Sequence, residues 1–192
     1  MALVLALFMA LGLAGCSGED DTADTPEADA TRSESFVGEA PGIRTRVEVG
    51  EIVGRLPKRP ATAAAAEVAE VVDDWIDGAY VGGDYPRNSF GDAFAGFTDG
   101  ASRLAADQSG LLSNAVVGEK VDTVTATRRV VRVDLLAPKG KLAGATAHVN
   151  LVFDLSGDVD RTDQVRGRLL LTHSRRGWQV FGFDIERGEV KG

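Results

Sequence analysis

Few residues in this chain of 192 could carry acid–base chemistry. Tyr80 and Asp84 lie near the end of a predicted helix, and His173 lies on the apolar face of a predicted strand. An imidazole or carboxylate that takes a proton, beside a phenol that polarises an oxygen, would support proton transfer in a pocket. The sequence assigns no carboxylate partner to His173. It therefore favours a hydrogen-bonded or wet position at the rim of the sheet over catalysis.

The familiar catalytic and cofactor motifs are absent from the sequence. It contains no phosphate-binding loop, dinucleotide fingerprint, nucleophile elbow, zinc-protease motif or EF-hand. One cysteine and two histidines predict no metal site, and no cofactor is expected. The alternating acids Asp158, Asp160 and Asp163 lack the central glycine and final glutamate of a calcium loop, which favours a solvated hairpin connection.

A loop at residues 82–90 offers candidates for binding a partner. It reads GGDYPRNSF, and Pro86 would fix the exit of the chain from the preceding helix. A simple turn is one interpretation. The alternative is a loop that presents Tyr85 and Arg87 to another protein.

The N-terminal residues have the pattern of a signal peptide followed by a lipid-attachment site. Residues 1–13 are almost wholly apolar and too short for a bilayer span of about 20 residues, but they suit a signal-peptide core. Leu13-Ala14-Gly15-Cys16 resembles the bacterial lipobox, in which the peptidase cuts before an acylated cysteine. This resemblance implies a lipid at Cys16 and leaves no thiol for catalysis.

The acidity of the chain belongs to a short segment. Residues 17–39 hold eight acidic residues and one arginine, whereas residues 40–192 hold 21 acids and 20 bases. The composition of the acidic segment predicts a flexible tether, because it cannot bury enough apolar surface to offset the entropy of ordering. A near-neutral domain disfavours nucleic-acid binding. We therefore divide the chain into a signal peptide (1–15), a lipidated Cys16 with a tether (16–40) and one α+β domain (41–192).

Helices are expected in the first half of the domain. Alternation in 44–53 predicts a short strand, with Val47, Val49 and Val53 on one side. Residues 61–81 carry one apolar stripe at helical spacing, which ends at Gly82 and Gly83. Two short helices should follow, one carrying Phe90, Phe94 and Phe97 and one capped by Thr98.

From residue 121 the apolar period changes to two. The predicted strands are 121–136, 143–155, 164–175 and 178–187. A three-residue turn ending at Gly177 would set Ser174 opposite Trp178 and keep Phe181, Phe183 and Ile185 on the Leu169/Leu171 face. The sequence thus predicts an α+β roll, with helices packed on a curved antiparallel sheet.

This order of elements resembles the cone-shaped nuclear transport factor 2-like fold over residues 44–187. The fold is seen in ketosteroid-isomerase-like and polyketide-cyclase-like enzymes and in non-enzymatic Mce-associated envelope proteins. Together with the lipobox, the segments at 82–90 and 176–184 (RGWQVFGFD) resemble actinobacterial-type lipoproteins. For an enzyme, the resemblance implies a pocket holding His173 with Asp84 or Tyr80. Folds of this type often dimerise through the sheet face, and Val130, Val152, Leu170 and Val180, which lie there among charged residues, permit a homodimer without requiring one.

These observations favour a membrane-anchored, extracytoplasmic lipoprotein that is not an enzyme. Its domain would bind an envelope protein or an apolar small molecule, or serve a lipid-import or secretion machine as an accessory subunit. The alternative is a ketosteroid-isomerase-like or cyclase-like enzyme, or a carrier with a pocket near His173.

The lipid anchor can be tested directly. The full chain should partition into detergent, because two or more acyl chains at one residue bind membranes firmly. The Cys16→Ala variant should stay unprocessed or soluble, as measured by detergent phase separation and mass spectrometry. A mature wild-type protein without lipid would contradict this expectation.

Overall fold

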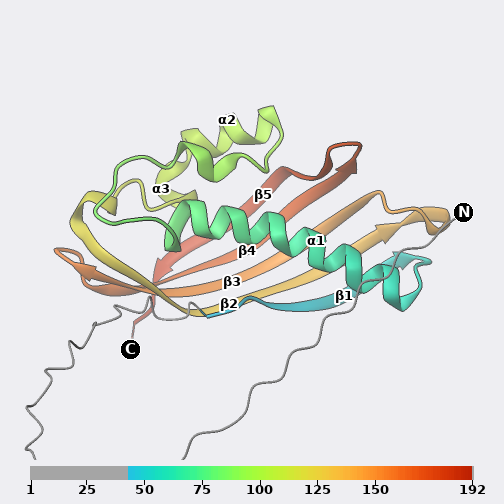
Figure 1. Ribbon diagram of the computed structural model, residues 1–192, viewed down its shortest axis with the longest axis horizontal. Coiled ribbons are helices and arrows are strands. Elements are labelled where there is room, and N and C mark those ends of the chain that lie inside the picture. Colours follow the sequence, from blue (N-terminus) through green and yellow to red (C-terminus); the bar gives the residue numbers. More distant parts are fainter. Residues whose placement is uncertain (1–42, 192) are drawn as a thin grey trace, which may run out of the picture. The chain divides into compact units, whose positions relative to one another are not determined.

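A computed structural model describes residues 43–191 (Figure 1). The predicted signal peptide, Cys16 and the tether lie outside the described residues. The elements in chain order are β1 (Arg46–Gly54), α1 (Lys58–Ile76), the π-helical turn η1 (Asp77–Val81), η2 (Gly91–Phe94), α2 (Asp99–Asp107), α3 (Ser109–Leu112), η3 (Gly118–Lys120), β2 (Val121–Ala137), η4 (Pro138–Gly140), β3 (Gly144–Gly157), β4 (Arg161–Ser174) and β5 (Gly177–Glu189). No helix in 43–191 is long and apolar enough to cross a membrane.

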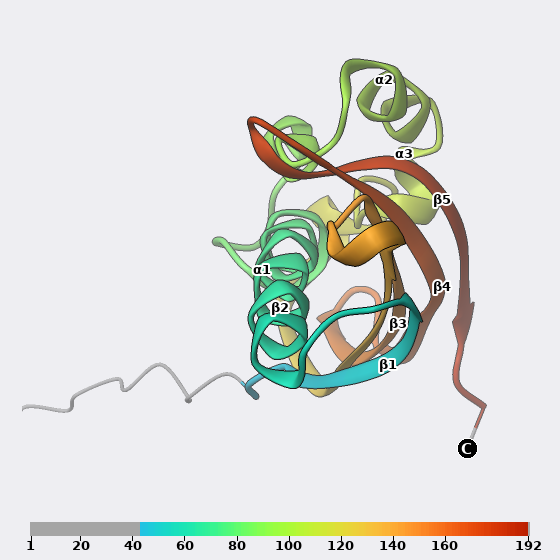
Figure 2. The same cartoon turned by 90° about the vertical axis from the view of Figure 1, so that its right-hand side faces the viewer.

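The predicted α+β class is confirmed, but the sheet is mixed rather than antiparallel. Its five strands follow the order β1-β2-β3-β4-β5. Strands β2 to β5 form an antiparallel meander, whereas β1 runs parallel to β2. Parallel neighbours need a long crossover connection, and here α1, α2 and α3 together form that crossover. The helices cover one side of the sheet, which we call the inner face (Figure 2). The opposite side is the outer face.

The predicted long helix is confirmed, with its last five residues forming the π-helical turn. The stripe facing the sheet is unusually small: Ala61, Ala64, Ala65 and Ala69 are buried beside Val68 and Val72. On the sheet, Ala145 and Ala147 belong to the same core. Small side chains on both sides let the helix lie close to the strands, and this close packing positions everything else on the inner face.

Side-chain alternation along β3 and β4 agrees with the prediction. Ala145, Ala147, Val149, Leu151, Phe153 and Leu155 are all buried on β3, as are Val165, Leu169 and Leu171 on β4. The predicted cap of α2 is also present, since the Thr98 side chain accepts a hydrogen bond from the Ala101 N–H.

The side chains that follow or form two β-bulges lie on the opposite face of the sheet from the one predicted. On β1 the register shifts between Val49 and Ile52, so Val53 turns away from the side of Val47 and Val49. On β5, Val180 pairs with Leu171 and Gly182 with Leu170, which leaves Phe181 as the extra residue. Phe181 is therefore exposed instead of facing the core. Val180, expected among the charged residues, is fully buried.

The bulge on β5 has an identifiable cause in the helical crossover. The Val180 N–H donates to the Gly96 carbonyl at 3.0 Å, and the Val180 carbonyl accepts from Thr98 N–H at 2.8 Å. These bonds fix Val180 against the segment before α2, so the extra residue next to it is displaced outward. The hairpin register differs as well: Ser174 pairs with Gly177, and His173, not Ser174, lies opposite Trp178.

Neighbouring alanines on α1 provide a matched test of the close packing. Ala65 is fully buried, whereas Ala66 is exposed. Ala65→Leu should reduce the free energy of unfolding by about 1–3 kcal/mol, because added methyl groups force the helix away from the strands. Ala66→Leu should change it by less than about 0.5 kcal/mol. Urea denaturation measures both, and equal stability of the two variants would contradict the packing argument.

Candidate functional site

Tyr80 is part of the packed interior. It is fully buried in η1, with its ring centroid 5.5 Å from that of Trp75 and 5.6 Å from that of Phe153. Its hydroxyl donates a hydrogen bond to the Leu111 carbonyl at 2.8 Å. Burial raises the pKa of Tyr80 far above its usual value, so the phenol stays protonated. The residue ties the crossover to the sheet and has no free polar group to offer a substrate.

The loop after η1 is held inward by its own side chains. The Tyr85 hydroxyl donates to the Tyr80 carbonyl and accepts from the Asn114 amide at 2.9 Å. The Arg87 guanidinium lies 4.2 Å from the centroid of the Phe90 ring and donates to the Gly78 carbonyl at 3.0 Å. Tyr85 and Arg87, predicted as partner-binding candidates, are thus half-buried and engaged within the domain.

Asp84 and His173 lie apart from each other and from the interior. Asp84 is exposed beside Asp122 at an open depression of about 290 Å³. His173 is exposed at the rim of the sheet, where its ring packs on Trp178 with centroids 4.8 Å apart. The Trp178 indole donates to the Glu67 carboxylate at 3.2 Å.

Tyr80 and His173 lie at opposite ends of the sheet. The guanidinium of Arg187 lies 5.6 Å from the Tyr80 ring centroid and binds Asp163. Asp163 precedes His173 by ten residues on β4, which is about 33 Å at 3.3 Å per residue. One small substrate cannot contact both groups, so the structure does not bring the predicted acid–base candidates together.

A buried polar cluster at the Tyr80 end was missed by the sequence analysis. Asp163 is 1% exposed and accepts hydrogen bonds from Arg161 at 2.7 Å and from Arg187 at 2.7 Å. Arg187 also donates to the Ser113 carbonyl at 2.7 Å and to the Asn114 side chain at 2.9 Å. The cluster therefore fastens the segment after α3 to β4 and β5. All four contacts are charge-assisted, which makes them strong.

The alternation of buried and exposed residues along β4 and β5 could have predicted the contact between Asp163 and Arg187. Asp163 shares the parity of the buried Val165, and Arg187 shares that of the buried Ile185. Because Val165 and Arg187 are cross-strand partners, the two charged side chains are diagonal neighbours on the inner face. The prediction that Asp163 belongs to the hairpin connection is wrong, because β4 begins at Arg161.

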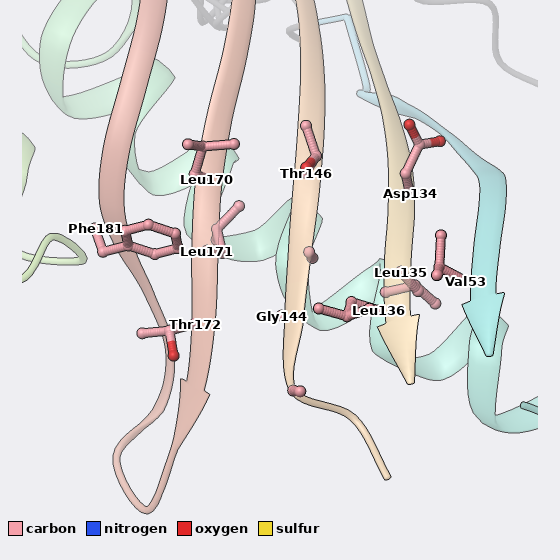
Figure 3. A pocket seen from close by; sticks show the side chains of 12 residues that line it. Val53, Asp134, Leu135, Leu136, Gly144, Thr146, Leu170, Leu171, Thr172 and Phe181 are labelled. Atoms are coloured by element: carbon pink, nitrogen blue, oxygen red, sulfur yellow. The ribbon is translucent and has the colours of Figure 1, made fainter. Parts of the chain in front are cut away.

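The outer face carries an open, largely apolar groove of about 380 Å³ (Figure 3). This outer-face groove crosses all five strands near the ends of β1 and β2. Its outward-pointing side chains are Val53, Asp134, Leu136, Thr146, Leu170, Thr172 and Phe181. Three of them are large and strongly exposed: Phe181 at 54%, Val53 at 53% and Leu136 at 45%. Exposed apolar side chains gathered around a recess typically mark an interaction site.

Both β-bulges turn a side chain to the outer face, where it lines the groove. Val53 follows the bulge on β1, and Phe181 is the bulged residue on β5. Without the bulges, both residues would share the side of their inward-facing neighbours. Between them Gly144 has no side chain, and a Cβ there would lie 3.2 Å from the Leu171 carbonyl. The groove is thus a product of backbone irregularity at two edge strands, where bulges often redirect side chains.

Asp134 forms the polar wall of the groove and also supports the β1 bulge. Its carboxylate accepts from the Glu51 N–H at 2.8 Å and lies 2.8 Å from His148 Nε2. Partial burial opposes its charge, but the Glu51 N–H and His148 outweigh that effect and lower the pKa of Asp134. Asp134 is therefore a fixed negative charge beside an otherwise apolar surface.

No protein-family model, curated protein or solved structure matches this chain. Among residues 43–191 no group of three or more histidine, cysteine or acidic side chains is placed to hold a metal ion. The candidate site with the best geometric support is the outer-face groove. Leu170, predicted on the homodimer face, lines it, whereas Tyr80, Asp84, Tyr85, Arg87 and His173 do not.

The importance of the buried pair can be measured against an exposed one. Arg187→Met should reduce the free energy of unfolding by about 3–5 kcal/mol, because it leaves the Asp163 carboxylate buried with less compensation. Arg166→Met removes a similar pair with Glu186 on the outer face, where both side chains are more than half exposed. We expect that change to be below about 1 kcal/mol. Similar losses for both variants in urea denaturation would contradict the assignment.

Proposed function

We propose that this chain is a membrane-anchored, extracytoplasmic lipoprotein whose folded part is a non-catalytic binding domain. The observation that carries the proposal is the outer-face groove, where Val53, Leu136 and Phe181 are held in solvent by a rigid sheet. Leaving three large apolar side chains exposed costs solvation free energy unless another surface covers them. A binding partner would supply that cover.

The anchor of the proposed lipoprotein rests on residues 1–16. The apolar segment, the small residues Ala14 and Gly15 and the single Cys16 support lipid attachment. The acidic residues 17–39 would then act as a spacer between the membrane and the domain. The domain would lie on the extracytoplasmic side of the cell membrane.

An enzyme of ketosteroid-isomerase or cyclase type has less support. Such a site needs its base and its oxygen-polarising group around one substrate, whereas Tyr80 and His173 lie near opposite ends of β4. The small residues Ala145 and Ala147, which could have left a pocket near His173, belong to the core that includes α1. A carrier of apolar molecules would have to use the outer-face groove instead.

The cone-shaped nuclear transport factor 2-like roll belongs to this proposal. A long helix on the inner face of a twisted meander supports it. A homodimer through the outer face would place Val130, Val152 and Leu170 at the interface, and these three residues are half-buried. A second copy of the chain is thus one occupant of the groove, and an envelope protein or an apolar small molecule is another.

Photocrosslinking from the groove tests the proposal. A benzophenone amino acid at Phe181, in the full chain in its membrane, should form one discrete adduct, because the exposed ring would lie at the interface. The same group at Leu104, which is 50% exposed on α2, serves as the control. A product of twice the chain mass identifies a second copy. A discrete product of another protein-sized mass identifies an envelope protein. A small mass increase identifies a small molecule.

A second variant links the adduct to the groove. Leu170→Glu should remove at least nine-tenths of the Phe181 crosslink, because a charge would lie inside the apolar contact. Circular dichroism should show an unchanged fold, since Leu170 lies on the outer face. No adduct from position 181, or equal adducts from 181 and 104, would overturn the proposal.

A further inference from the structure

Three connections meet at one end of the sheet. Strands β1 and β2 end there and β3 and β5 begin there, so the β1–α1, β2–β3 and β4–β5 connections lie together (Figure 1). The outer-face groove opens at the same end, because Val53, Leu136, Gly144 and Thr172 all lie within two residues of an end of their strands. We call this end of the sheet the basic end, after the lysine and arginine residues of its three connections.

The three connections contain lysine and arginine but no acidic residue. Two carboxylates lie nearby: Asp134, which contacts His148 and Arg132, and Glu67, which accepts a hydrogen bond from Trp178. Residues 55–66, 137–153 and 171–183 include no aspartate or glutamate. Their seven basic residues are Arg55, Lys58, Arg59, Lys139, Lys141, Arg175 and Arg176. All seven are exposed, and none forms an ion pair with another residue of 43–191.

The other end of the sheet has the opposite charge. Its exposed acids lie in the loop after η1, at the start of β2, in the β3–β4 hairpin and at the end of β5: Asp84, Glu119, Asp122, Asp158, Asp160 and Glu189. Arg161 and Arg187 also lie there, but both bind Asp163. The exposed Lys120 and Lys191 lie at this end as well, so its six exposed acids outnumber its unpaired bases. A domain of near-zero total charge is thus polarised along its strands, and such a distribution orients a protein in an electric field or near a charged surface.

We propose that the basic end docks on an anionic lipid bilayer. The seven cationic side chains would contact lipid phosphates, while Val53, Leu136 and Phe181 beside them would enter the interfacial region. Cationic and apolar side chains on one surface are the combination that binds anionic membranes. The acidic end would point away. This inference names the lipid surface as the partner and rests on the proposed function for the anchor that holds the domain nearby.

The acidic residues 17–39 of the same chain have the charge to bind these loops instead. However, that segment contains Phe36 and Val37 as its only large apolar residues. It could neutralise the loops but would not cover Val53, Leu136 and Phe181 together. A bilayer interface satisfies both requirements, so it is the occupant that the surface favours.

Energy transfer in vesicles tests the orientation. The full-length protein is reconstituted into phosphatidylcholine vesicles with or without phosphatidylglycerol, and a headgroup-labelled lipid is the acceptor. The donor dye is attached at Ser174→Cys, in the basic end, or at Ser156→Cys, near the acidic end; both serines are exposed. With phosphatidylglycerol, transfer from position 174 should exceed transfer from 156 several-fold. In phosphatidylcholine alone, or in 1 M salt, the two should converge, because salt screens the attraction.

Charge variants of equal size provide the control. Lys139→Gln, Lys141→Gln, Arg175→Gln and Arg176→Gln together should abolish the difference between positions 174 and 156. The matched variant changes Arg103, Lys120, Arg128 and Lys191, which are exposed elsewhere, to glutamine and should keep it. Equal transfer from both positions in anionic vesicles, as expected if residues 17–39 cover the basic end, overturns the proposal. So does loss of the difference in both variants.

Failure of the anchor is detected separately. Mass spectrometry of the same preparation shows whether Cys16 carries acyl chains. Protein without lipid is then tested by sedimentation with the anionic vesicles, where removing the four loop charges should weaken binding by about six hundredfold, at about fivefold per residue. Unchanged binding of that variant overturns the docking proposal, whatever the state of Cys16.

Discussion

The close approach of α1 to the sheet is the constraint on which the rest of the structure depends. Alanines such as Ala65 on the helix and Ala147 on β3 let the two layers pack with little space between them. The large residues Trp75, Tyr80 and Phe153 pack together on the inner face beside the C-terminal end of α1. Because side chains occupy this interior, binding is left to the surfaces of the domain, chiefly to the outer face.

The same crossover that covers the inner face also shapes the outer face. Its segment before α2 takes both backbone hydrogen-bonding groups of Val180 at the edge of β5. The resulting bulge turns Phe181 outward, and a second bulge on β1, held by Asp134 and the Glu51 N–H, does the same for Val53. The outer-face groove is therefore coupled to the fold and does not depend on a flexible loop.

The strand topology decides where the charged residues of this domain lie and which of them form ion pairs. Buried charges are paired, as in the Asp163–Arg187 contact that fastens the segment after α3 to the sheet. Exposed charges on the outer face pair across strands, as Arg166 does with Glu186 and Arg168 with Asp184. The charges of the connecting loops are separated by sign between the two ends of the strands. The exposed apolar groove opens at the cationic end, which gives that end the properties of an interface.

The sequence by itself determined the α+β class, the long helix, the four strands of the meander and the faces of β3 and β4, because periodicity is a local property of the chain. It could not determine the parallel pairing of β1, the turn of Val53 and Phe181 to the outer face, or the separation of Tyr80 from His173. Bulges and registers depend on backbone hydrogen bonds between distant segments. The lysines and arginines of three loops can be counted in the sequence, but only strand pairing gathers them at one end.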